Sequence, residues 1–183
     1  LVVLIVNRKE AFIEMGNKNT KLLLFAKIIS GRGIASKREL LDHNELKLLG
    51  IEKPVPGTIN LILNKPIEII LEDVDLTKET KGRLFRNKSY FWKGYINNIP
   101  VIFVRWQGSP RHILEALSEF NLRSKGYSPG DEVSLIFEKQ IFRDLKNLNK
   151  IYWKLLWGKR ENLWYSSKFY WFLVRLIIIP FSR

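Results

Sequence analysis

A glycine-containing segment near the start of this 183-residue sequence has the composition of an anion-binding loop. Two close glycines let the backbone approach a ligand, and successive N–H groups can then face an anion such as phosphate. The third glycine of a dinucleotide-binding loop is absent, as is the Gly-Lys-Ser/Thr ending of a phosphate loop, so a plain turn is the alternative interpretation. The segment consists of Ser30, Gly31, Arg32, Gly33, Ile34, Ala35 and Ser36.

A second segment could hold a divalent cation. Pro56 and Gly57 predict a tight turn into a strand, and Thr58 and Asn60 follow it two residues apart. On a strand, residues at this spacing point to the same face, which would bring a hydroxyl and an amide oxygen together. Mg²⁺ commonly takes one or two protein oxygens and completes its shell with water and phosphate. The alternative is a polar strand face beside a turn.

A third segment carries groups that suit a nucleotide. Arg123 could bind a phosphate and Asn121 could read the edge of a base, although an arginine at such a place is often only solvated. The segment consists of Asn121, Leu122, Arg123 and Ser124. No catalytic base can be named, because His43 and His112 are the only histidines and a lone histidine is usually structural or solvated. The absence of cysteine excludes disulfides, thiolate zinc sites and cysteine nucleophiles.

Short apolar runs separated by Gly and Pro predict a mainly β chain folded as a small barrel with short helices. We expect strands at residues 22–29, 58–63, 66–71, 89–95, 100–106 and 132–137, and helices at residues 36–49 and 113–120. Composition divides the chain into an N-terminal stub (1–20), the barrel domain (21–138) and a basic aromatic tail (139–183). Residues 1–6 are too few for a signal-peptide core or a membrane span, so a buried strand is the plainer interpretation.

The charge indicates an anionic partner but does not choose one. The net charge is +13 with 46% hydrophobic residues, which suits nucleotide phosphates, anionic lipid or nucleic acid. The tail has ten Lys or Arg against two acidic residues, and its four tryptophans are spaced by four, seven and seven residues. They form one face of a predicted amphipathic helix, which could contact a membrane surface or pack on the barrel or a second subunit. Nucleic-acid binding is unlikely, because no recognised signature is present.

Taken together, the three segments resemble the archaeal-type CTP-dependent riboflavin kinases over roughly residues 22–137. The most specific match is a Leu-Gly pair, here Leu49 and Gly50, followed by Pro-Gly-Thr-x-Asn-Leu-x-Leu at residues 56–63. Segments 113–115, 121–123 and 129–133 support it in the correct order. The resemblance implies a six-stranded cradle-loop (RIFT-like) barrel. It also implies a cytoplasmic transferase that moves the terminal phosphate of CTP to riboflavin, giving FMN and CDP with Mg²⁺.

The resemblance also implies site residues. Residues 31–36 and 121–124 would contact the cytidine nucleotide, and Thr58 and Asn60 would coordinate Mg²⁺. The flavin positions fall near Gln107 and His112, where the sequence departs from the family pattern, so the phosphate acceptor could be a related alcohol. The rival hypothesis is a barrel without catalytic activity, or with a changed acceptor, tethered to a membrane or protein partner by its tail.

Overall fold

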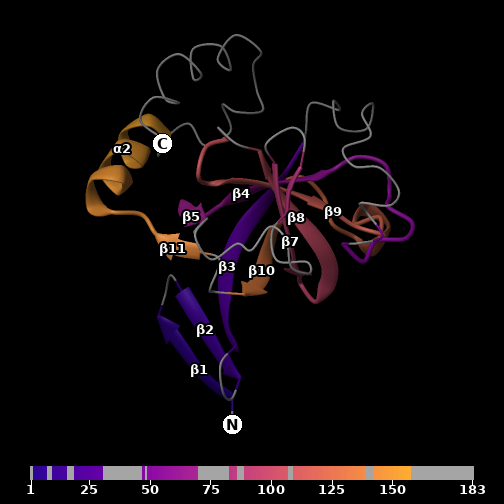
Figure 1. The fold of residues 1–183 in the computed structure, drawn as a ribbon, viewed down its shortest axis with the longest axis horizontal. Helices are drawn as coiled ribbons and strands as arrows, with labels where there is room; N and C mark the ends of the chain where they lie inside the picture. Colours follow the sequence, from indigo (N-terminus) through magenta and orange to yellow (C-terminus); the bar gives the residue numbers. More distant parts are fainter. Residues whose placement is uncertain are drawn as a thin grey trace.

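The fold is a closed six-stranded antiparallel β-barrel, seen in a computed structural model (Figure 1). The structure describes residues 2–7, 10–15, 19–30, 47, 49–69, 83–85, 89–106, 109–138 and 142–157. Around the barrel the strands are β3 (Asn19–Ile29), β10 (Glu132–Glu138), β7 (Ser89–Ile96), β8 (Ile99–Trp106), β9 (Ile113–Leu117) and β4 (Ile59–Leu63). Pairing of β4 with β3 closes the ring, which removes the exposed edges that an open sheet would have.

The barrel interior is filled by alternate residues of the six strands, as the two-residue period of a strand requires. Three aromatic rings lie together there: Phe103 contacts Trp92 and Phe137, with ring centroids 6.0 and 5.4 Å apart. A second apolar cluster covers the outer face of β7, β8 and β9. Its members are Leu49, Ile51, Phe91, Ile102, Val104 and Leu117.

The β7–β8 hairpin turns at Asn97 and Asn98. Asn97 and Asn98 both have positive φ, 45° and 71°, which matches the twist of the flanking strands in a two-residue hairpin loop. The Asn97 side chain also accepts hydrogen bonds from the backbone N–H and the hydroxyl of Ser134 on β10, at 2.7 and 2.8 Å. The turn is therefore tied to the next strand of the barrel.

The helix predicted at residues 113–120 is wrong, because residues 113–117 form strand β9. Leu, Glu and Ala are good helix formers, which is why local preference indicated a helix. In the barrel both faces of the segment are covered: Leu114 and Ala116 lie in the interior, and Leu117 lies in the outer apolar cluster. The burial of both faces of this strand in the folded protein therefore outweighs the helix propensity of its residues. Most of the helix expected at residues 36–49 lies outside the described residues.

Five described strands lie outside the barrel ring: three extend its sheet, and two form a separate sheet. A hairpin of β1 (Val2–Asn7) and β2 (Glu10–Met15) continues from β3, so the N-terminal stub adds two strands to the barrel sheet. Strand β6 (Arg83–Phe85) pairs with β7, and β5 (Ile67–Ile69) pairs with β11 (Phe142–Asp144). Strand β11, which follows the predicted boundary at residue 138, thus belongs with β5 to a separate two-stranded sheet.

Helix α2 (Asn147–Trp157) follows β11 and packs against the barrel beside β5 (Figure 1). Trp153 Nε1 donates a hydrogen bond to His112 Nδ1 at 2.8 Å, and the Trp157 ring centroid lies 5.0 Å from that of His112. The sequence left open whether the tryptophan face contacts a membrane or packs on the barrel or a second subunit. Trp153 and Trp157 pack on the barrel. Trp164 and Trp171 lie outside the described residues. Within the described part of the chain, no helix is long and apolar enough to cross a bilayer.

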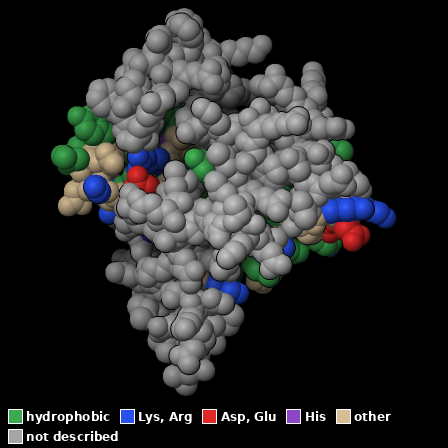
Figure 2. All heavy atoms as spheres, viewed as in Figure 1, with side chains coloured by type: hydrophobic (Ala, Val, Ile, Leu, Met, Phe, Trp, Pro, Cys, Tyr) green, Lys and Arg blue, Asp and Glu red, His purple; other side chains and the backbone are tan. Residues whose placement is uncertain are grey.

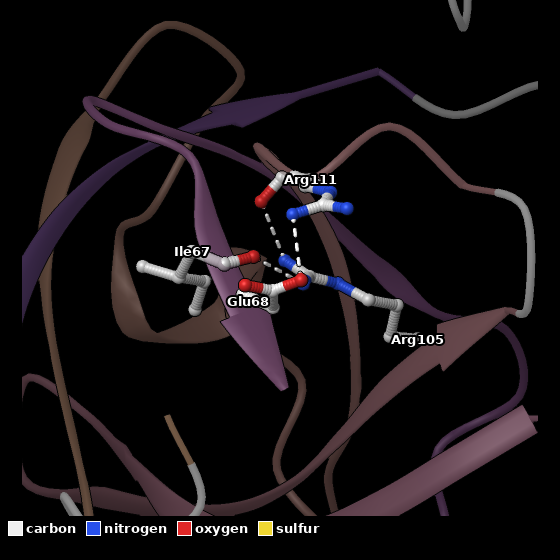
Figure 3. Close-up of polar contacts among 4 residues, drawn as sticks. All are labelled: Ile67, Glu68, Arg105 and Arg111. Carbon is white, nitrogen blue, oxygen red and sulfur yellow. Dashed lines mark hydrogen bonds and ion pairs between the residues drawn. The ribbon is translucent and has the colours of Figure 1, made fainter. Parts of the chain in front are cut away.

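A buried arginine holds this end of the barrel together (Figure 3). The Arg105 guanidinium donates to three carbonyl oxygens, those of Ile67 (2.9 Å), Arg111 (2.7 Å) and Ile113 (3.3 Å). Arg111 in turn forms an ion pair with Glu68 at 2.9 Å. Burial, with a smaller contribution from the charge of Arg111, lowers the pKa of Arg105 to about 9. Arg105 therefore remains charged at neutral pH while linking β8 to β5 and to the start of β9.

Candidate functional site

Three chain segments meet at one end of the barrel. They are the turn before β4 with Thr58 and Asn60, the strand that leads into the glycine segment, and the strand that leads towards residues 121–124. Strand β4 begins there, and its neighbours β3 and β9 end there because both run antiparallel to it. In this register Asn60 lies between Ile29 of β3 and Glu115 of β9. Ser30, the first residue of the glycine segment, directly follows Ile29 and is exposed. We refer to this end, with the loops that leave it, as the β4-start end.

A loop anchored to the end of β9 leads into β4. The backbone N–H of Val55 donates to Ser118 O at 2.8 Å, and Glu119 Oε1 accepts from the N–H groups of Glu52 and Lys53 at 2.6 and 3.1 Å. These backbone hydrogen bonds favour the ionised form, so the pKa of Glu119 is lowered. The loop is thereby held beside residues 118–119, immediately before the third segment.

The turn before β4 is built as the sequence predicts. Gly57 has φ of +97°, a conformation that a residue with a Cβ adopts only with strain. The chain then enters β4, where Ile59, Leu61 and Leu63 face the barrel interior. Asn60, between Ile59 and Leu61, consequently points to the outer face, and Thr58 directly precedes the strand, two residues before it.

The Asn60 amide makes one hydrogen bond with the residue two positions earlier. Its Nδ2 donates to Thr58 O at 3.4 Å, and Oδ1 takes no part in that bond. Asn60 is 8% exposed, whereas Thr58 is partly exposed. A hydroxyl and an amide oxygen two residues apart are ligands that suit a hard cation such as Mg²⁺. The two residues therefore fit the cation predicted for them.

Glu115 is a candidate site residue that sequence reasoning missed. It is the direct cross-strand neighbour of Asn60, and opposite residues in an antiparallel pair have Cβ atoms about 4.5–5.5 Å apart. It is partly buried and lies on the face that carries Asn60. A carboxylate there adds negative charge beside the two neutral oxygens, and it could bind a cation or accept a proton. Only the strand register could reveal it, because Glu115 lies far from Asn60 in the sequence.

The third segment forms a compact turn after β9. Asn121 Oδ1 accepts from the backbone N–H of Arg123 at 3.0 Å, and the Ser124 hydroxyl donates to Asn121 O at 2.7 Å. Leu122 is buried and anchors the turn in the interior cluster. A short 3₁₀ helix, Arg123–Lys125, follows. The exposed Arg123 side chain and the Asn121 amide nitrogen are the groups that this turn presents.

A further turn joins the third segment to the end of β3. Gly130, at φ of +106°, donates its N–H to Ile28 O at 2.8 Å, and the N–H of Ile28 donates to Asp131 O at 2.9 Å. Residues 121–131 thus run from the end of β9 to the end of β3. The strands that border Asn60 on both sides are therefore connected through this segment.

Some predicted site residues lie elsewhere. The structure does not describe Gly31–Ser36 or Gln107. His112 is fully buried directly before β9, five residues before Leu117, or about 16 Å away along the chain at 3.3 Å per extended residue. The hydrogen bond from Trp153 makes Nδ1 an acceptor, so the proton of the neutral ring lies on Nε2. The structure therefore does not bring His112 to the β4-start end.

The class that the described residues define is a closed six-stranded antiparallel β-barrel with a polar face at the β4-start end. The chain matches no protein-family model, and a search of curated proteins found no match.

Proposed function

We propose that this protein is a CTP-dependent phosphotransferase of the riboflavin kinase type. It would transfer the terminal phosphate of CTP to a hydroxyl of riboflavin or a related alcohol. The observation that supports it most is the convergence at the β4-start end: Asn60 lies beside the strand leading into the glycine segment and beside the strand leading into residues 121–124. The resemblance rests on motifs that are separated in the sequence, and it requires them to lie at one site. The pairing of β4 with β3 and with β9 supports this, because it brings the strands next to these motifs side by side.

Each group in the proposal has a defined task. Thr58 and Asn60 would hold Mg²⁺, which when bound supplies positive charge to the phosphate oxygens. Backbone N–H groups of the Gly31 and Gly33 segment would bind phosphate, and Arg123 would add charge. Phosphoryl transfer passes through a loose transition state, so positioning and charge neutralisation contribute most of the rate enhancement.

The reaction also requires a route for one proton. As the acceptor oxygen forms its bond to the terminal phosphorus, the bond from that phosphorus to the CDP oxygen breaks, and the hydroxyl proton must leave. We assign its acceptance to Glu115, the carboxylate opposite Asn60. The products are then the phosphorylated alcohol, which is FMN for riboflavin, and CDP.

The acceptor site is the less defined half of the proposal. His112 is buried against Trp153 and Trp157, so we do not assign it a contact with a flavin. The acceptor class is therefore stated as riboflavin or an alcohol of similar shape, with Gln107 as the remaining residue that the resemblance implies.

Transfer of labelled phosphate from CTP to riboflavin, with and without Mg²⁺, tests the proposal. We expect Mg²⁺-dependent transfer that falls roughly 100-fold or more in the double variant Thr58→Ala, Asn60→Ala, because both proposed ligands of the ion are lost. Asn64→Ala is the matched control, since Asn64 is an exposed asparagine just past the other end of β4. Equal transfer by the double variant, or no CTP binding by the wild-type chain, would rule out the assignment.

A further inference from the structure

Helix α2 is attached to the barrel through two tryptophans and one histidine. Trp153 Nε1 donates a hydrogen bond to His112 Nδ1 at 2.8 Å, and the ring centroids of Trp153 and Trp157 lie 5.5 and 5.0 Å from that of His112. His112 is 0% and Trp157 3% exposed, so water is excluded from this contact. Other parts of the helix face solvent: Leu148 and Leu155 are exposed, and Figure 2 shows hydrophobic and Lys or Arg side chains at the edge of the molecule where α2 lies. The attachment of α2 therefore centres on one imidazole.

The hydrogen bond from Trp153 fixes the charge that His112 carries in the docked state. The indole Nε1 is a donor only, so His112 Nδ1 must present its lone pair and the ring must be neutral. In a protonated imidazole both nitrogens carry hydrogen, and Nδ1–H would then face the N–H of Trp153. The hydrogen bond would be lost, and a cation would be buried at the contact. Docking of α2 and protonation of His112 therefore oppose each other.

The charges around the contact are mostly positive. The Arg105 guanidinium donates to Arg111 O and Ile113 O, on either side of His112, and Arg111 pairs with Glu68. The other charged residues that the structure places on β11, on α2 and beside β5 are Arg143, Asp144, Lys150, Lys154 and Lys65. Counted together, these groups are six cations and two carboxylates. They add to the cost of a proton on His112 while α2 is docked, because like charges repel.

We propose that His112 is an acid-sensitive latch for α2. Above about pH 6.5, where an ordinary histidine is neutral, the ring accepts the hydrogen bond from Trp153 and α2 stays docked. Below it, the released state takes up a proton on His112 and the docked state does not, so the equilibrium shifts towards release. Release uncovers His112 and the surface beneath Trp157, and the strands of the barrel ring stay paired. The inference does not depend on the transferase activity.

The size of the effect follows from proton linkage. For a released imidazole that titrates at about pH 6.5 and a docked one that stays neutral, the opening constant of α2 rises about 30-fold from about pH 7.5 to about pH 5.0. An 11-residue helix is marginal in water once it leaves the protein, so the amide hydrogens of released α2 exchange with solvent. Amide hydrogen exchange therefore measures the opening constant even when the released state is rare.

Hydrogen exchange of the full chain at these two pH values tests the proposal, with each rate divided by that of an unprotected amide at the same pH. We expect the opening constants of α2 amides to rise about 30-fold, and those of β7 and β8 amides to stay smaller than them at both pH values. His112→Gln is the matched control, because the glutamine oxygen can still accept from Trp153 but does not titrate. Its α2 opening constants should change less than about threefold.

Nitrogen-15 NMR of the imidazole provides a second measurement that needs no variant. While α2 is docked, His112 should be neutral with its proton on Nε2, and it should remain so at about pH 5.5. The proposal fails if His112 is protonated at neutral pH, if the α2 opening constants of the wild-type chain change less than about threefold, or if they rise equally in His112→Gln. It also fails if α2 and the barrel strands exchange with the same opening constants, because release would then be part of global unfolding.

Discussion

Replacing Arg105 by methionine should destabilise the barrel without touching the β4-start end. Methionine fills a similar volume but removes all three hydrogen bonds that the guanidinium donates to carbonyl oxygens. Hydrogen bonds from a charged donor are each worth about 1.5–3 kcal/mol, so the gross loss is about 4–9 kcal/mol. Two terms reduce it. Arg111 O keeps a hydrogen bond from the N–H of Ile67, and the cost of burying the cation, visible in the lowered pKa of Arg105, is removed.

The expected net change is a loss of about 2–4 kcal/mol in the free energy of unfolding, a large part of the roughly 5–15 kcal/mol that a domain has in total. Urea unfolding followed by circular dichroism measures it. Arg105→Lys is the informative comparison, because an ammonium keeps the charge but does not have the planar fork that reaches several carbonyls. If the methionine variant is as stable as the wild-type chain, the three contacts do no more than offset the burial of the charge, and the reasoning is refuted.

Two further predictions concern single residues. Gly94→Ala should cost about 2–4 kcal/mol of unfolding free energy, because its Cβ would lie 2.6 Å from both Ile136 O and a ring carbon of Phe103, and urea unfolding within 0.5 kcal/mol of the wild type would contradict the packing. Glu119→Gln should reduce stability at neutral pH, since the folded pKa of Glu119 lies below the ordinary value of 4.5. That contribution is present above pH 4.5 and disappears as the pH falls through the lowered pKa, so the two proteins should converge in acid, and a difference that grows on acidification would be the wrong sign.

The strands could be predicted from the sequence wherever alternation and turn residues agreed. Residues 22–29 and 58–63 have clear signals, and the Asn97-Asn98 turn sets the register of β7 and β8. Strand β9 could not be predicted, because its residues prefer a helix locally and become a strand only between β8 and β4. Its environment arises from pairings distant in sequence, which no local window contains.

The candidate site was predictable in its parts but not in its arrangement. The Pro-Gly turn and the two-residue spacing of Thr58 and Asn60 are local features, and the structure has both. The position of Glu115 opposite Asn60 depends on the β4–β9 register, which the sequence does not specify. Which face of α2 packs on the barrel also could not be predicted. It depends on His112, whose Nδ1 accepts a hydrogen bond from Trp153. Without that contact, the tryptophans were as good a candidate for the membrane as for the barrel.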